Sequence, residues 1–414
     1  MKDEILTNIE NPSQLERLYR TDKAAFKKAF TAVYPQVQDN SVAAFWNARL
    51  NFAKDEISFG NRSQLLFVIV LSICAGIIVK LPALLNLNEE FFYSRNAGFI
   101  IFPALSAYFA WRNKLSALKI AMVAGCMLAA LFFINSLPDN PSSDTLTLSC
   151  VHLLLFLWSL LGFVFVGDGS NNPEKRLGYL SYNGDLIVMT TLIVIAGIIL
   201  SGITVGLFSL IGFNINNFYF ENIALFALPA APIVGTYLTR TNPQLVGKVS
   251  PVIARIFSPL VLVMLVIYLI AIVYSGKDPY NDREFLMVFN ALLIGVMAII
   301  FFSVAETSKT SKSSMETWVV FMLSIVTIIV NGIAISAILF RITEWGITPN
   351  RAAVLGGNIL ILVNLLLVTL KLERVVSNKA TINAVGRVMA SYLPVYFVWT
   401  IIVTFLFPFI FGFR

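Results

Sequence analysis

Apolar stretches long enough to cross a lipid bilayer run through this chain from residue 64 to its last turn, and there are about eleven of them. An apolar helix needs about 20 residues to cross the hydrocarbon layer. Lipid cannot satisfy a bare backbone, and the stretches are continuous instead of alternating, so we expect helices and not barrel strands. The sequence therefore predicts an all-α integral membrane protein. The expected spans are 64–85, 97–111, 116–137, 146–166, 186–211, 219–239, 252–275, 285–305, 318–340, 353–370 and 388–411.

The composition supports a membrane protein and gives no sign of nucleic-acid binding. Of the 414 residues, 57% are hydrophobic and 13% are charged, whereas a soluble domain has about 25% charged residues. The net charge of +7 is spread over the loops. It does not form one basic patch with interleaved aromatic residues, so nucleic-acid binding is not expected.

Lys and Arg residues gather in every second loop, which predicts the orientation. Of the 30 Lys and Arg residues, all but seven fall on one side, which the positive-inside rule places in the cytoplasm. The exceptions are Lys80, Arg95, Lys277, Arg283, Arg341, Arg351 and Arg414. With eleven crossings, we expect the N-terminus inside and the C-terminus outside.

Residues 1–62 form a polar segment ahead of the transmembrane domain of residues 63–414. Ser13 and Glu16 fit an S-x-x-E capping box, and apolar residues follow at helical spacing. We expect a cytoplasmic amphipathic helical region. It is interpreted as a helical hairpin on the membrane surface or on cytoplasmic loops, and docking of a cytoplasmic partner protein is the alternative.

The sequence offers few groups for catalysis or for binding a cofactor. Its three cysteines are scattered, and it has one histidine, so the common zinc and haem ligand sets cannot be assembled. We find no Walker loop, no H-E-x-x-H and no G-x-S-x-G. No catalytic residue, metal or cofactor is predicted.

Polar groups inside the expected spans are also few. No Asp lies in the middle of a span; Glu221 lies near the outer end of the sixth and Glu306 just past the inner end of the eighth. Four amides lie within spans, and we expect them to bridge helices by hydrogen bonds. These are Asn290, Asn331, Asn358 and Asn364.

The sixth span contains Pro229 and Pro232, which remove backbone donors and kink or break the helix. Broken helices line cavities in transporters. A plain kink is the alternative interpretation. Glu221, in the same span, is a further candidate of this region.

The segment from Phe340 to Arg351 predicts a tight corner between two helices on the outer side. Gly346 suits a helix C-cap, Thr348 the next N-cap and Pro349 the first helical position. Arg351 falls in a first turn, where the dipole disfavours a cation, so Glu344 or Glu221 is expected to compensate it. The corner is interpreted either as a rigid structural turn or as an anion or headgroup site built from two arginines. Its candidate residues are Arg341, Glu344, Gly346, Thr348 and Arg351.

The same segment carries a resemblance. Arg341-Ile342, Gly346-Ile347-Thr348 and Arg351 are similar to the R-I-x-x-x-G-[IL]-T-x-x-R signature of an uncharacterised bacterial multi-pass family, the domain of unknown function numbered four-one-five-three. The resemblance implies a protein of the bacterial cytoplasmic membrane and no particular activity.

Three functions are consistent with these patterns. The first is a carrier or permease for a small or amphiphilic solute, and the shortage of buried charge weighs against it. The second is a non-transporting scaffold or sensor that acts through residues 1–62. The third is an intramembrane enzyme acting on lipid headgroups, for which no nucleophile or metal set is found. Membrane lipids are the partners expected in every case.

Overall fold

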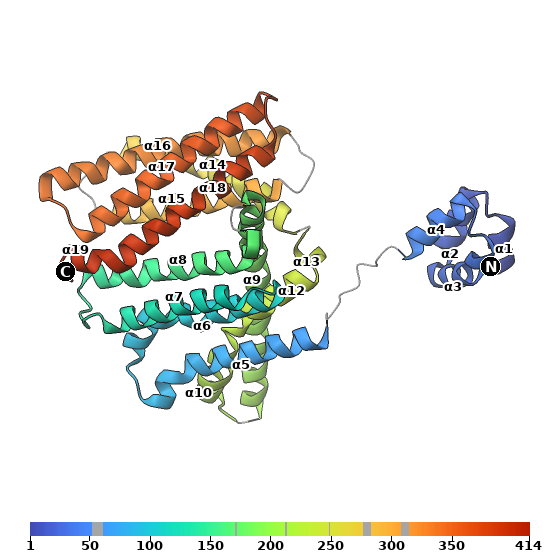
Figure 1. Ribbon diagram of the computed structural model, residues 1–414, viewed down its shortest axis with the longest axis horizontal. Helices are drawn as coiled ribbons and strands as arrows, with labels where there is room; N and C mark the ends of the chain where they lie inside the picture. Colours follow the sequence, from blue (N-terminus) through green and yellow to red (C-terminus); the bar gives the residue numbers. More distant parts are fainter. Residues whose placement is uncertain (52–60, 170–171, 212, 248, 276–282, 308–313) are drawn as a thin grey trace. The chain divides into compact units, whose positions relative to one another are not determined.

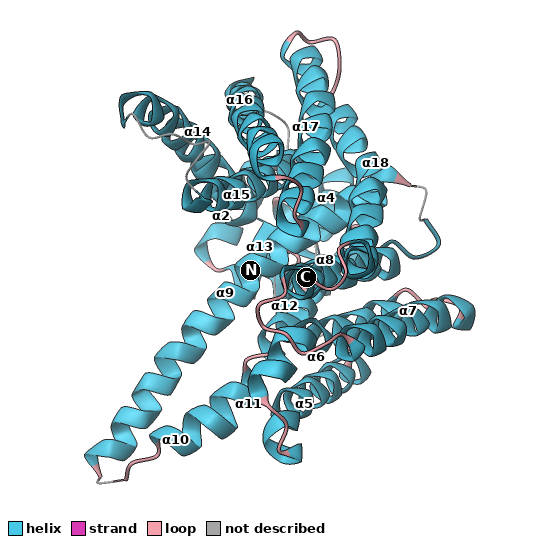
Figure 2. Ribbon diagram, turned by 90° about the vertical axis from the view of Figure 1, so that its left-hand side faces the viewer, coloured by secondary structure: helices cyan, strands magenta, loops and turns pink. Residues whose placement is uncertain are grey.

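The computed structural model describes residues 1–51, 61–169, 172–211, 213–247, 249–275, 283–307 and 314–414. Every regular element in these ranges is a helix (Figures 1 and 2). The chain divides into two compact units, Met1–Ser58 and Phe59–Arg414. Each is described by itself.

The N-terminal unit is a small group of helices with a core of its own. Its helices are α1 (Lys2–Thr7), α2 (Pro12–Thr21), α3 (Lys23–Val33), a 3₁₀ turn (Tyr34–Gln36) and α4 (Ser41–Asn51). The buried side chains are those of Ile5, Leu15, Phe26, Ala29, Phe30, Val33, Ala43, Trp46 and Leu50. This is more than a two-helix hairpin, because α1 and α2 also contribute to the core.

The capping box predicted at Ser13 is wrong. The N-cap of α2 is Asn11, whose side chain accepts a hydrogen bond from the Gln14 amide, and Pro12 occupies the first helical position. Proline needs no hydrogen-bond partner there, so the helix begins at Pro12, one residue before Ser13. Glu16 instead forms ion pairs with Arg20 and with Arg49 of α4, both at 2.9 Å.

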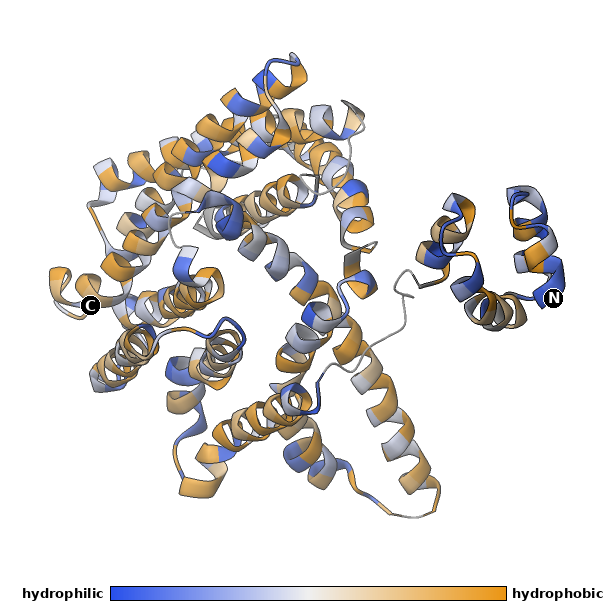
Figure 3. Ribbon diagram, turned by 45° about the vertical axis from the view of Figure 1, so that its right-hand side comes forward, coloured by the Kyte–Doolittle hydropathy of each residue, from blue (hydrophilic) through white to orange (hydrophobic). Residues whose placement is uncertain are grey.

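The second unit consists of long apolar helices. They are α5 (Arg62–Leu85), α6 (Glu89–Arg112), α7 (Ala117–Ser136), α8 (Asp144–Val166), α9 (Pro173–Leu210), α14 (Val249–Ser275), α15 (Arg283–Thr307), α16 (Ser314–Trp345), α17 (Pro349–Val376) and α18 (Ile382–Ile401). Shorter pieces are α10 (Asn216–Phe218), a π-helix (Tyr219–Ala224), α11 (Leu225–Ala227), α12 (Ala230–Thr241), α13 (Gln244–Gly247), a second π-helix (Ile402–Leu406) and α19 (Phe407–Ile410). Apolar residues cover most of these long helices (Figure 3).

Ten helices in the described residues are long and apolar enough to cross a membrane, so the chain is an all-α multi-pass membrane protein. The expected crossing outside this set is the second, α6, whose 24 residues include Glu89, Glu90, Arg95 and Asn96. Arg95 and Asn96 are buried, and neighbouring helices can satisfy polar groups there. Ten of the eleven predicted crossings are therefore helices with both the length and the apolar composition of a membrane span. The remaining one, α6, has the length but not the composition.

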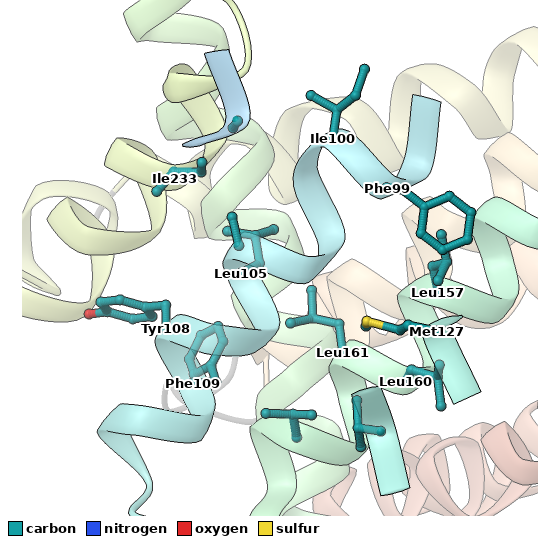
Figure 4. Close-up of a cluster of buried hydrophobic side chains, with 14 of the residues drawn as sticks. Phe99, Ile100, Leu105, Tyr108, Phe109, Met127, Leu157, Leu160, Leu161 and Ile233 are labelled. Carbon is teal, nitrogen blue, oxygen red and sulfur yellow. The ribbon is translucent and has the colours of Figure 1, made fainter. Parts of the chain in front are cut away.

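Two cores hold the second unit together. The first joins α5 to α8 with the start of α9 and with α12, and the second joins α14 to α18. Helix α9 contributes to both, because Tyr179 and Tyr182 pack in the first core while Leu177 and Leu180 pack in the second. Figure 4 shows part of the first core, in which side chains from α6, α7 and α8 interdigitate.

Candidate functional site

The corner between α16 and α17 has the backbone that the sequence predicts. Gly346 has a φ of +75°, which glycine adopts at little cost, and its N–H donates to the Ile342 carbonyl at 2.9 Å. Thr348 is the N-cap of α17, and its hydroxyl accepts from the Arg351 N–H at 3.3 Å. Pro349 is the first helical residue. Two helices therefore reverse direction over three residues.

Arg351 is compensated by carbonyl groups and an aromatic ring, not by a carboxylate. Its Nη1 donates to the carbonyl oxygens of Trp345 at 2.9 Å and Gly346 at 2.6 Å, which lie at the negative end of α16. The guanidiniums of Arg341 and Arg351 lie 5.3 and 5.7 Å from the centre of the Trp345 ring. Within the described chain, Arg351 has no ion pair with Glu344 or Glu221, so the predicted compensation is wrong. The geometry is that of a locked helix corner.

The sixth expected span is interrupted where its prolines lie. The chain turns at Leu228 and Pro229, and α12 then begins at Ala230 with Pro232 in its first turn, where a missing N–H costs nothing. Upstream, the carbonyl of Glu221 accepts from Lys80 Nζ at 2.9 Å, which ties the π-helix to α5. The two prolines therefore lie at the junction between α11 and α12.

The membrane-embedded amides bridge helices, as predicted. Asn358 of α17 donates to the side chain of Asn290 on α15 at 2.7 Å, and Asn331 of α16 donates to the Asn358 carbonyl at 3.1 Å. Asn364 donates to the Tyr396 hydroxyl on α18 at 3.0 Å. These bonds tie together the helices of the second core.

The candidate site is a cleft of about 470 Å³ between α7, α8 and α18, closed at one end by the start of α9. We name it the inner cleft, because its lining lies in the halves of α7 and α8 that the sequence places on the cytoplasmic side. Its lining residues include Met122, Cys126, Trp158, Phe163, Tyr179, Phe397 and Arg176. Met122 and Phe163 are 48% and 37% exposed, so the rim of the cleft lies on the surface of the helix bundle.

Close packing of α8 against α9 shapes the floor of the inner cleft. A methyl group at Gly162 would lie 2.8 Å from the Tyr179 ring, so glycine lets the ring approach α8. The Tyr179 hydroxyl donates to the Trp158 carbonyl at 2.6 Å, and the Trp158 indole N–H donates to Asn183 at 2.9 Å. With their polar atoms satisfied, these two aromatic residues present apolar surface to the cleft.

Arg176 supplies the cationic group of the inner cleft. It lies in the first turns of α9, and its Nη1 approaches the Ala390 carbonyl of α18 at 3.5 Å. A guanidinium is planar and binds phosphate or carboxylate through two parallel hydrogen bonds. The cleft thus combines apolar walls in the membrane with a cation at its predicted cytoplasmic end.

A smaller and more polar cavity of about 290 Å³ lies between α14, α15 and α16. It is lined in part by Arg255 and Glu316, which form a 2.9 Å ion pair, and by the buried Glu306, which accepts from Ser181 of α9 at 2.6 Å. The sequence placed Glu306 just beyond a span end, whereas the structure buries it in contact with α9. In the part of the chain that the structure describes, no group of three His, Cys, Asp or Glu could hold a metal ion.

Sequence reasoning missed the inner cleft, because its walls come from helices far apart in the chain. From the sequence, Arg176 was counted only among the positive charges on the predicted cytoplasmic side. Asn172 caps α9 and Pro173 is its first residue, a signal that would have placed Arg176 on a helix at the membrane edge.

No protein-family model matches this chain, and neither a curated protein nor a solved structure matches it. The family resemblance of residues 341–351 stays a prediction.

Proposed function

We propose that this protein is a carrier of a membrane amphiphile with an anionic headgroup, which it binds in the inner cleft. The observation that carries the proposal is the combination of an apolar, lipid-facing cleft with Arg176 at one end. Moving an acyl chain from the bilayer into an apolar cleft gives little binding free energy. Specificity therefore has to come from the charged end of the ligand. The arginine favours phosphate or carboxylate.

The cavities favour an amphiphile over a small hydrophilic solute. A hydrophilic solute needs polar groups along its route, yet the inner cleft is walled mainly by aliphatic and aromatic side chains. Pro229, Asn331 and the Arg341–Arg351 corner do not line the inner cleft or the 290 Å³ cavity.

The test is lipid selectivity of the purified protein, measured by native mass spectrometry after equilibration with equal amounts of phosphatidylglycerol and phosphatidylcholine. The wild type should retain phosphatidylglycerol, and Arg176→Ala should lower that preference about tenfold, the value of one charge-assisted contact. Arg176→Lys should keep part of it. Lys175→Ala is the matched control, because Lys175 is the exposed neighbour that does not line the cleft.

Transport is measured separately in proteoliposomes with a fluorescent acyl-labelled phosphatidylglycerol and a membrane-impermeant quencher. The wild type should move the lipid between leaflets faster than protein-free vesicles, and Arg176→Ala should slow it. Equal selectivity in Arg176→Ala and wild type, or no transport above the protein-free rate, would contradict the proposal.

A scaffold function is the second candidate, and the N-terminal unit favours it. This unit has its own core, and Phe45 on α4 is 61% exposed. On the same helix, Ala43, Trp46 and Leu50 are buried in the core of the unit. If a partner binds there, Phe45→Ser should remove a co-purifying protein and leave lipid transport unchanged. Retention of every co-purifying protein would count against this function.

A further inference from the structure

A second and larger cleft lies on the other side of α7, in the opposite half of the membrane-spanning region. It has a volume of about 770 Å³ and is lined by the last third of α5, by residues 87–103 at the start of α6, and by residues 124–135 of α7. We name it the outer cleft. Because α5 and α7 run one way and α6 the other, most of its lining lies toward the ends of these helices that the sequence predicts to be outside.

Helix α7 is a wall of both clefts. Met122, Val123 and Cys126 line the inner cleft, whereas Leu128 and Leu131 line the outer cleft. The ends of α7 are held by cations: Arg95 binds the carbonyl of Leu137 at one end, and Lys119 pairs with Asp168 at the other. The helix is thus fixed at its ends and flanked by a cleft on each side.

The two clefts adjoin the same apolar core. Phe99 and Met127 line the outer cleft, and Leu160 lines the inner cleft. All three belong to the same buried core, and Figure 4 shows them around Leu157. Side chains of one buried core therefore line both cavities.

Three asparagines line the outer cleft: Asn88 caps α6 by accepting from the Phe91 N–H, and the other two form an amide pair. Asn96 of α6 and Asn135 of α7 donate to each other's side-chain oxygens at 3.0 and 2.8 Å. Both line the cleft, and Asn96 is 5% exposed. A carboxamide has two N–H donors and two acceptor lone pairs. The reciprocal pair uses one of each on Asn96, which leaves one N–H able to donate to a ligand in the cleft.

We propose that the outer cleft is a second binding site for the same lipid, in which an acyl chain fills the cavity and the Asn96–Asn135 amide pair hydrogen-bonds to the ester linkage. This inference rests on the proposed carrier function. The inner cleft receives the lipid in one leaflet, the outer cleft holds it in the other, and α7 separates the two. The amide pair suits an uncharged carbonyl, whereas Arg176 suits the charged headgroup, so the two sites recognise different parts of one molecule.

The test uses phosphatidylglycerol with a diazirine on its acyl chain, photoactivated in nanodiscs that contain the full-length protein, with labelled residues mapped by mass spectrometry. Wild type should be labelled in both clefts. Leu131→Trp fills the outer cleft and should remove labelling there while keeping the label in the inner cleft; Met122→Trp should do the reverse. Ile120→Trp, an exposed position of α7 that lines neither cleft, is the control.

A second comparison tests the amide contact. An ester-linked probe should label the outer cleft severalfold more than its ether-linked analogue, and Asn96→Leu with Asn135→Leu should remove that difference. Labelling of the inner cleft alone, or equal labelling by both probes in the wild type, would overturn the second site and leave the carrier function standing. Absence of label from both clefts would overturn both proposals.

Discussion

Arg95 of α6 donates a hydrogen bond of 2.7 Å to the carbonyl oxygen of Ile134, in the last turn of α7. The same guanidinium binds the carbonyls of Leu137 and Pro138 and lies over the Phe91 ring. Arg95 is 2% exposed. A side chain from a neighbouring helix thus satisfies carbonyl groups that a helix C-terminus leaves without partners.

Arg95→Ala should therefore destabilise the fold. It leaves buried carbonyls unsatisfied, and the loss should be about 3 kcal/mol. Thermal unfolding in detergent measures it, with Arg62→Ala, at an exposed position, as the matched control. Equal thermal stability of the two variants would show that the capping contact contributes nothing.

Arg351→Ala should lower stability without abolishing lipid transport. Arg351 holds the carbonyls of Trp345 and Gly346 and is partly exposed, so we expect a loss of about 1 kcal/mol. Glu344→Gln should change little, because Glu344 forms no ion pair with Arg351. Unchanged stability with loss of transport would instead support the anion-site interpretation of the corner.

Two adjacent glycines in α17 should respond in opposite directions to substitution by alanine. A methyl group at Gly356 would lie 2.1 Å from the Trp399 ring, whereas at Gly357 it would meet nothing within 4 Å. Gly356→Ala should cost about 1–3 kcal/mol through overpacking. Gly357→Ala should be neutral or stabilising by up to about 1 kcal/mol, because alanine favours helix. Thermal unfolding of the two variants under identical conditions checks this contrast.

The N-terminal unit should lose stability in acid. The Arg20 guanidinium, hydrogen-bonded to Glu16, and then Arg49 hold the pKa of Glu16 below its usual value. A lowered folded-state pKa contributes stability above the unfolded value, about 4.3, and loses it as the pH falls through the folded value. Hydrogen exchange of peptides from residues 1–51 in the full-length protein should show this loss in the wild type and not in Glu16→Gln. Glu10→Gln, at an exposed position, should behave as the wild type.

The helices could be predicted because the bilayer imposes one length and one composition on each crossing. The first and last residues of each helix were harder to predict, since helices continue past the apolar layer. Helix α9 was expected from residue 186 but begins at Pro173, where Asn172 and Pro173 provide a start signal that hydrophobicity does not contain. Likewise α6 begins at Glu89 rather than at residue 97, after the cap formed by Asn88.

The corner and the clefts show the difference between local and distant information. Gly346, Thr348 and Pro349 act within a few residues of each other, so their roles could be predicted. The partners of Arg351 could not be predicted, because they are backbone carbonyl groups, which every residue has whatever its side chain. The clefts depend on how α7 packs between α6 and α8, and nothing in the spacing of Met122 or Asn135 indicates which helix each one meets.

Helix α7 forms a wall of both clefts, and this gives their occupancies a thermodynamic relationship. Because the ends of α7 are held, a ligand in one cleft that displaced the middle of this helix would narrow the other cleft. Two sites joined by such an element are linked reciprocally: the factor by which the first ligand changes the affinity for the second is the factor by which the second changes the affinity for the first. A lipid bound in one leaflet would thereby change the affinity of the cleft in the other leaflet through a single 20-residue helix.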